Sequence, residues 1–221
     1  MRNSRTSFQS KEGIAIGLGC LLGDACIQKN ENRLQIEQSE LDYVTWKWNL
    51  FRKHNLVTEN CNIKQLKITR MNKEKGINKD TISYRFYSRS LFQDFHCFYK
   101  FKGPGDPTFN PNEPPKRRKM YIPQLLDWFH HPLALAIYYM DDGSAVDNQA
   151  YFSTGEVTDG EVILMQQVLK KNFDLDSSFR LSGDRYVGLL IRRKDCSKFL
   201  NLVEGYVSEV NGMERKLKIT R

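Results

Sequence analysis

The chain has 221 residues, of which 40% are hydrophobic and 27% charged, proportions that are ordinary for a folded globular protein. No apolar run approaches the roughly 18 residues that a membrane-spanning helix needs, so the sequence excludes an integral membrane protein, and we expect no membrane partner. The 34 Lys and Arg residues exceed the 26 Asp and Glu residues, and a net charge of +8 indicates a polyanionic partner such as nucleic acid. The five cysteines are widely spaced without a CxxC pair, which argues against structural zinc and predicts a reduced, intracellular chain.

The first predicted element is the apolar run at residues 13–27, "GIAIGLGCLLGDACI". Its glycines follow the spacing G-x-G-x-x-x-G inside the apolar run, which does not fit a dinucleotide-binding fingerprint. Ala15, Gly19 and Gly23 recur every four residues and therefore share one face of a helix. Small residues on one face let a second helix approach closely, so the run predicts a helix–helix contact that ends at Asp24.

A strand, a helix, a hairpin and a second helix are expected after this run, because the apolar spacing changes between periods of two and of three to four residues. In chain order they cover residues 33–38, 41–53, 62–70 with 81–89, and 91–101.

Each of these strands is predicted to have one apolar and one polar face. The polar residues are Arg33, Gln35, Glu37, Gln65, Lys67, Thr69, Ser83, Arg85, Tyr87 and Arg89. These are the side-chain types that bind phosphates and base edges, so a shared face of this kind is a candidate DNA-binding surface. An ordinary solvated sheet face is the alternative for any single strand.

A segment that contains five of the seven prolines follows the first half. Proline and glycine interrupt helices and strands, so residues 104–119 are predicted to be a linker. The linker divides the chain into a first repeat at residues 1–103 and a second at residues 120–221.

The second repeat opens with residues 132–143, "PLALAIYYMDDG", again a short apolar run that ends in an acid. Aligning the terminal acids pairs Asp24 with Asp142 at an offset of 118 residues. A strand at 151–156, a helix at 159–171, a hairpin of 178–181 with 185–192 and a helix at 195–207 follow. Their candidate DNA-binding residues are Ser153, Arg180, Arg185 and Arg192.

The two repeats predict an α+β fold in which two helices cross at a pseudo-symmetry axis, each ending at its acid. A carboxylate at the negative end of a helix is unfavourable by about 0.3–1 kcal/mol, and two such groups close together repel further. Either one carboxyl stays protonated or divalent cations bind between them. Paired hard oxygen ligands beside a phosphate-binding face suit Mg²⁺ and phosphodiester hydrolysis. The alternative is that Asp24 and Asp142 only terminate helices.

Both runs resemble the motif of LAGLIDADG homing endonucleases, in the single-chain class that carries two motifs. The matching residues are 17–25, "GLGCLLGDA", and 135–143, "LAIYYMDDG". The first departs at Ala25, where the motif has glycine, and Leu22 and Met140 stand at the motif's earlier aspartate position. The resemblance implies two αββαββα units, with saddle-shaped antiparallel sheets that grip DNA.

The resemblance also implies the roles of individual residues. Asp24 and Asp142 would bind the metal, with the carbonyls of Gly23 and Asp141 as candidate further ligands. Lys119 and Lys216 resemble the basic residues that the family places near each scissile phosphate, although phosphate-positioning charges are the alternative for both. Gln35 resembles a polar residue that positions water, and Ser153 is its counterpart in the second repeat.

These expectations describe a monomeric, Mg²⁺-dependent, site-specific endonuclease for double-stranded DNA with a long, non-palindromic target. The main alternative is a binding protein on the same scaffold, either a maturase that assists folding of intron RNA or a DNA-binding regulator. A non-nucleic-acid enzyme that uses paired acids is a third reading. Organelle and bacterial genomes both carry such genes, so the compartment stays open.

Overall fold

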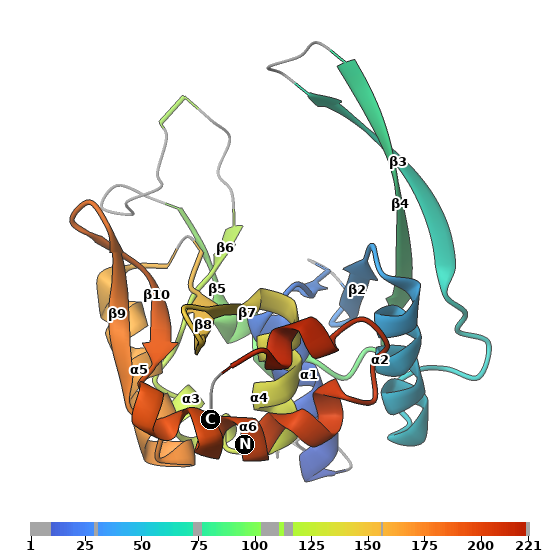
Figure 1. The fold of residues 1–221 in the computed structure, drawn as a ribbon. Helices are drawn as coiled ribbons and strands as arrows, with labels where there is room; N and C mark the ends of the chain where they lie inside the picture. Colours follow the sequence, from blue (N-terminus) through green and yellow to red (C-terminus); the bar gives the residue numbers. More distant parts are fainter. Residues whose placement is uncertain are drawn as a thin grey trace, which may run out of the picture.

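The computed structural model describes residues 10–28, 31–72, 77–102, 111–112, 117–155 and 157–219, without the side chains of residues 70–79. Most of the predicted linker, the tip of the first hairpin and Glu156 therefore lie outside the described residues. Two halves with the same succession of helices and strands lie side by side around a central helix pair (Figure 1).

The first half contains two α-helices, a four-stranded sheet and a 3₁₀ helix. Its elements are α1 (Lys11–Leu22), β1 (Cys26–Ile27), β2 (Leu34–Gln38), α2 (Leu41–Lys53), β3 (Lys64–Asn72), β4 (Ile77–Tyr87) and η1 (Gln93–Phe98). The strands pair antiparallel in the order β1-β2-β4-β3. The long β3–β4 hairpin rises well above the body of the molecule (Figure 1).

The second half repeats this plan. Its elements are α3 (Leu125–Trp128), α4 (Pro132–Asp142), β7 (Gly143–Val146), β8 (Gln149–Ser153), α5 (Asp159–Phe173), β9 (Ser177–Ser182), β10 (Arg185–Ile191), η2 (Arg193–Asp195), α6 (Cys196–Val207) and η3 (Glu214–Leu217). The antiparallel sheet has the order β7-β8-β10-β9, which matches the order of the first sheet. The predicted α+β fold of two pseudo-symmetric repeats is confirmed.

The predicted helix at residues 91–101 is wrong. Phe95 and Phe98 are buried, and with Phe92 they recur every three residues, which is the period of a 3₁₀ helix rather than an α-helix. The chain then enters β5 (Tyr99–Phe101), which pairs with β6 (Arg117–Lys119). The last three residues of the predicted linker therefore form a strand.

The two motif helices start at local capping signals. The Ser10 side chain accepts a hydrogen bond from the Gly13 N–H at 3.0 Å, which satisfies one of the free donors of the first turn of α1. Pro132 occupies the first turn of α4, where a missing N–H costs nothing, and the His131 ring accepts from the Leu133 N–H at 3.1 Å.

The two motif helices pack against each other in the centre of the molecule. A Cβ atom on Gly19 would lie only 2.7 Å from the Ala134 carbonyl oxygen and 2.9 Å from the Ile137 Cβ. The predicted close approach at Gly19 is therefore present, and glycine is required there because the α4 backbone occupies the space. Most residues of both helices are buried, which explains why their apolar runs continue around the helix.

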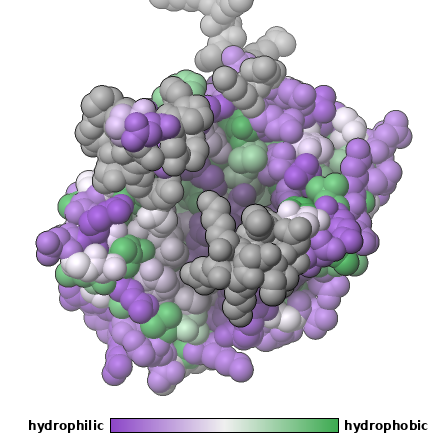
Figure 2. Space-filling view, turned by 90° about the horizontal axis from the view of Figure 1, so that it is seen from above, coloured by the Kyte–Doolittle hydropathy of each residue, from purple (hydrophilic) through white to green (hydrophobic). Residues whose placement is uncertain are grey.

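Each sheet packs one face on the helices and turns the other away from them. In β2, Leu34 and Ile36 are buried while Gln35 and Glu37 are partly exposed, and β8 repeats this alternation. Hydrophilic residues predominate on the molecule seen from above (Figure 2). Within the described part of the chain, no helix has the length and apolarity to cross a bilayer.

Replacing Gly19 with alanine tests the central contact. We expect Gly19→Ala to lower the free energy of unfolding by about 1–3 kcal/mol, because the new methyl group overpacks the α1–α4 contact. Gly205→Ala is the matched control, since Gly205 lies inside α6 and a Cβ there would meet nothing within 4 Å. The control should gain about 0.5–1 kcal/mol from helix propensity. Urea denaturation of both variants measures this, and equal shifts of the same sign would contradict the packing.

Candidate active site

The two motif acids lie where the central helices end. The Gly23 N–H closes the last turn of α1 on the Gly19 carbonyl, and Asp24 follows directly. Asp142 is the last residue of α4. The Asp24 N–H donates to the Asp141 Oδ2 at 3.2 Å, so the two helix ends are in direct contact.

The predicted repulsion between the carboxyl groups is present where the ends of α1 and α4 meet. Burial, together with the negative charges of Asp24 and Asp141, raises the pKa of Asp142 to about 7. Lys119 and Lys216 oppose this rise only in part. The site therefore brings together acids that are costly to ionise simultaneously.

Two lysines lie against the same helix ends. The Lys119 Nζ, from β6, donates to the Gly23 carbonyl at the end of α1. The Lys216 Nζ, from η3, donates to the carbonyls of Tyr139 at 3.2 Å, of Met140 and of Asp141 at 3.4 Å, at the end of α4. Cations are favourable at helix C-termini, where carbonyl groups lack intrahelical partners.

The two lysines are largely desolvated. Burial lowers the pKa of Lys119 and of Lys216, and the neighbouring aspartates oppose that change. The structure therefore gathers Asp24, Asp142, Lys119, Lys216 and the carbonyls of Gly23 and Asp141, all predicted from the sequence, into one place. Their chemical roles stay predictions.

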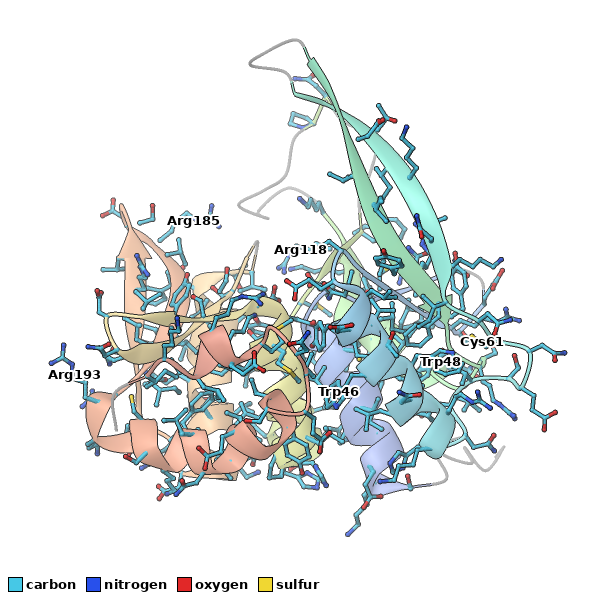
Figure 3. The ribbon with its side chains drawn as sticks, turned by 45° about the vertical axis from the view of Figure 1, so that its right-hand side comes forward. Trp46, Trp48, Cys61, Arg118, Arg185 and Arg193 are labelled. Atoms are coloured by element: carbon cyan, nitrogen blue, oxygen red, sulfur yellow. The ribbon has the colours of Figure 1, made fainter. Side chains whose placement is uncertain are left out.

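The segment that carries Lys216 is attached to α2 of the first half. The Trp46 indole donates to Glu209 Oε2 at 2.7 Å, and Trp46 projects from α2 in Figure 3. The Asn211 amide donates to Asp42 Oδ2 at 2.9 Å, and the Arg215 guanidinium to Glu40 Oε1 at 2.8 Å. These contacts attach the segment that follows α6 in the second half to α2 and its N-cap in the first half.

A buried ion pair that was not predicted from the sequence lies directly behind the acids. The Lys47 Nζ lies 2.6 Å from Asp141 Oδ1, and the two side chains are 1% and 0% exposed. The Tyr43 hydroxyl donates to the same oxygen at 2.8 Å. The signal was visible on α2, where Lys47 interrupts the buried row of Tyr43 and Phe51 at a spacing of four residues.

Gln35 is not the amide that contacts the acids. Its Nε2 donates to Glu37 Oε2 at 3.2 Å, and its Oε1 accepts from the Gln28 amide at 3.4 Å. The amide in contact is Gln38, whose Nε2 donates to Asp24 Oδ2 at 2.8 Å and to Asp141 Oδ1 at 3.0 Å. Gln35 and Asp24 do line a common cavity, so a role for Gln35 in positioning water stays a prediction.

The polar face of the first sheet is made by β2 and β4. Glu37 lies opposite Arg85, and its carboxylate accepts from the Arg85 guanidinium at 2.5 and 2.7 Å and from the Ser83 hydroxyl at 2.8 Å. Tyr87 lies opposite Gln35 on the same face. These five side chains share one face, as predicted.

The placement of Gln65, Lys67 and Thr69 on that face is wrong. Directly opposed residues in an antiparallel pair lie on the same face, and the β3–β4 register puts these three opposite Tyr84, Ile82 and Asp80. The residues of β3 that share the face of Ser83 and Arg85 are Leu66 and Lys64. This hairpin extends beyond the core, where Ile82 is 49% exposed, so hydrophobic alternation does not report which face is covered.

Two arginines of the predicted DNA-binding set lie away from the polar faces, whereas a third, Arg33, stays exposed. The Arg89 Nε donates to the Val57 carbonyl at 2.9 Å, in the loop that follows α2, so its predicted place on the polar face is wrong. Arg192 lines a cavity with Lys170 and Lys171 of α5, on the helical side of the second sheet, and its predicted place is also wrong. Arg33 is exposed and lies 3.6 Å from Glu31.

The second sheet carries its own polar face. Ser153 pairs with Gly188, which pairs with Arg180 on its other side, so Ser153 and Arg180 share a face. The Arg180 guanidinium stacks over the Tyr151 ring at 5.0 Å. Arg185 is exposed at the upper end of the β9–β10 hairpin (Figure 3).

A cavity of about 500 Å³ adjoins Asp142 between the halves. It is lined on one side by Arg117 and Lys119 of β6, and on the other by Ser153 and Thr154. Apolar side chains, among them Leu21, Leu22 and Phe98, line much of the rest, so the cavity combines an apolar wall with a few charged and hydroxyl groups.

The model of the LAGLIDADG DNA endonuclease family matches residues 14–199 of this chain. The chain belongs to this family.

Two solved structures have a similar fold. The structure of the homing endonuclease I-WcaI, bound to its DNA recognition sequence, has a TM-score of 0.72 and 21% sequence identity, covering 97% of this chain and 89% of that one. Full-length WhiA from Thermatoga maritima has a TM-score of 0.50 and 11% identity, covering 95% of this chain and 60% of that one. Identities this low establish the shared fold and nothing more.

A curated relative is the cytochrome b mRNA maturase bI2 of Debaryomyces hansenii, 28% identical over 184 residues. The match covers 80% of this LAGLIDADG chain and 63% of the maturase, so the chain spans less than two thirds of that protein's length.

The donor set of the site fits a hard divalent cation. Asp24 and Asp142 supply carboxylate oxygens, and the Gly23 and Asp141 carbonyls lie beside them. Among the described residues no cluster of three or more His, Cys, Asp or Glu side chains forms a complete metal cage. Mg²⁺ commonly binds one or two carboxylates and takes its remaining ligands from water and substrate phosphates, so the incomplete cage is compatible with it.

The raised pKa of Asp142 predicts a pH-dependent effect of Asp142→Asn on the metal-free protein. A carboxyl group whose pKa is higher in the folded state stabilises that state fully at pH values below its pKa in the unfolded chain, near 4. This stabilisation is lost as the pH rises through the folded-state pKa of about 7. We therefore expect Asp142→Asn to raise the melting temperature clearly at pH 8 and very little at pH 4. Thermal melts in EDTA at both pH values measure this. Asp127→Asn, at an exposed position, should show no such difference.

Proposed function

We propose that this LAGLIDADG protein is a site-specific endonuclease that cuts both strands of double-stranded DNA by metal-assisted hydrolysis. The observation that carries the proposal is the convergence of Asp24, Asp142, Lys119 and Lys216 at the ends of two crossed helices, beside two polar sheet faces. One acid and one lysine lie at the end of each central helix, so the site would have one set of groups for each strand.

The protein's own residues would position and stabilise the reacting groups. Asp24 and Asp142 would hold divalent metal ions, which supply Lewis acidity and a nucleophilic water for phosphodiester hydrolysis. Lys119 and Lys216, released from the carbonyls that they now contact, would stabilise negative charge on the phosphates in the transition state. Gln38, in contact with Asp24, would orient that carboxylate toward the metal.

The two polar faces would bind the target and read its sequence. The first face presents Gln35, Ser83 and Arg85, whereas the second presents Tyr151, Ser153 and Arg180. Different side chains at corresponding positions favour different base pairs, so we expect a target without two-fold symmetry. A net charge of +8 implies that binding weakens steeply with salt.

An intron maturase is the second candidate, and the likeness to the maturase bI2 of Debaryomyces hansenii favours it. A maturase would bind its own intron RNA, and one protein can have both activities. Filter binding of the RNA of the surrounding intron, compared with a DNA duplex of the joined flanking sequences, separates the two. The endonuclease proposal requires specific binding to the duplex.

Replacing either motif acid tests the endonuclease proposal. We expect Asp24→Asn and Asp142→Asn to reduce double-strand cleavage by at least about 100-fold, because each removes an ionised oxygen that metal-assisted hydrolysis needs. The substrate is a supercoiled plasmid that carries the joined sequences flanking the gene, with Mg²⁺ or Mn²⁺. Gel-shift affinity in EDTA should change little, and Asp127→Asn should cut normally. Full cutting by either site variant would refute the assignment.

A further inference from the structure

The Asp141 carboxylate is buried, and both of its oxygens accept hydrogen bonds. Its Oδ1 accepts from the Lys47 Nζ at 2.6 Å, the Tyr43 hydroxyl at 2.8 Å and the Gln38 amide at 3.0 Å. Its Oδ2 accepts from the backbone N–H of Asp24 at 3.2 Å. A carboxylate with four donors and a buried counter-charge has one defined orientation, because any rotation would leave a buried donor unsatisfied.

This cluster is connected to the catalytic acid of the first half at two points. The backbone N–H of Asp24 bonds to Asp141, and the carboxylate of Asp24 bonds to the Gln38 amide, which also bonds to Asp141. Asp24 is itself exposed. An exposed side chain would otherwise sample several rotamers, so these contacts restrict it.

The second half has no equivalent arrangement in the described residues. At the offset of 118 residues, Asp141 corresponds to Gly23 and Lys47 to Met165, which is buried in the core. Tyr43 corresponds to Glu161, which pairs instead with Arg118, and Gln38 corresponds to Glu156, which lies outside the described residues. Over the described ranges, no hydrogen bond reaches the Asp142 carboxylate.

Packing explains why only one half can carry the cluster. A Cβ added at Gly23 would collide with the Asp141 side chain, so an acid at one of these two positions excludes any side chain at the other. The inequality of the two halves is therefore a consequence of the close helix crossing.

We propose that Gln38, Lys47 and Asp141 are positioning residues for Asp24 alone, so that the two halves of the active centre are unequal. The strand whose cleavage depends on Asp24 then has a pre-organised acid, whereas the strand that depends on Asp142 does not. The strand inequality rests on the proposed endonuclease function; the fixation of Asp24 stands independently of it.

A purely structural role for the ion pair is the competing explanation, and the choice of variants separates the two. Removing one member of a buried pair destabilises the fold because the other charge is left uncompensated. The double variant Lys47→Met/Asp141→Asn removes both charges with little change of volume. The asparagine side chain at position 141 then faces the Asp24 N–H either with its NH2 group, which is a donor and cannot accept a hydrogen bond, or in a changed orientation. Gln38→Met leaves the ion pair intact and breaks only the bridge to the Asp24 carboxylate.

The first measurement needs no cleavage. Amide hydrogen exchange at Asp24, followed by NMR on the full chain, should accelerate by at least tenfold in the double variant. Met165→Leu, at the position that corresponds to Lys47, should leave the exchange rate unchanged. Unchanged exchange at Asp24 in a folded double variant overturns the proposal, whether or not the protein cuts DNA.

The second measurement resolves the two strands. With a duplex of the joined flanking sequences labelled differently on each strand, the double variant should cut one strand at least tenfold more slowly and the other within threefold of wild type. Gln38→Met should shift the same ratio in the same direction, and it decides the matter if the double variant does not fold. Equal slowing of both strands supports the structural explanation and overturns the inequality. If the wild-type protein cuts neither strand, the endonuclease proposal is refuted instead. The hydrogen-exchange measurement then decides by itself whether the cluster fixes Asp24.

Discussion

The close crossing of α1 and α4 governs the rest of the molecule. The space available at Gly19 lets the α4 backbone approach within van der Waals contact, so both helices are buried around most of their circumference. The contact continues to the C-terminal ends of both helices, where a Cβ on Gly23 would overlap the Asp141 side chain, so the terminal residues share one small volume. The acids, the lysines and the flanking sheets all take their positions from that crossing. A larger separation would leave Asp24 and Asp142 as unrelated surface groups.

The crossing creates an electrostatic conflict that the structure relieves in different ways on its two sides. Burial raises the pKa of both Asp141 and Asp142, but Asp141 is paired with Lys47 and fixed by hydrogen bonds, whereas Asp142, with a pKa of about 7, has only the partial compensation of nearby lysines. Lys119 and Lys216 lie on the carbonyl groups at the helix ends, where positive charge is favoured. Such a concentration of perturbed titratable groups is typical of functional sites, although ion-pair networks also produce it.

Part of the site followed from the sequence and part did not, for a physical reason. The paired acids and both lysines were predicted because each lies in a short local pattern that recurs or resembles the family motif. Gln38, Tyr43 and Lys47 were missed because their importance arises from contact with Asp141, about 100 residues away in the chain. The faces of β3 were assigned wrongly because the hairpin extends beyond the core, where hydrophobic alternation no longer reflects burial.

The sequence by itself determined the duplication, the two helix–acid runs and most helices and strands, because these depend on residues within a few positions of one another. Tertiary structure alone decided which amide meets Asp24, where Arg89 and Arg192 lie, and that Tyr99–Phe101 form a strand by pairing with β6. It also decided that the two halves differ: Gly23 and Asp141 occupy corresponding positions, but only one side chain fits between the crossed helices. Local periodicity cannot encode that exclusion, because it arises only where two distant backbones meet.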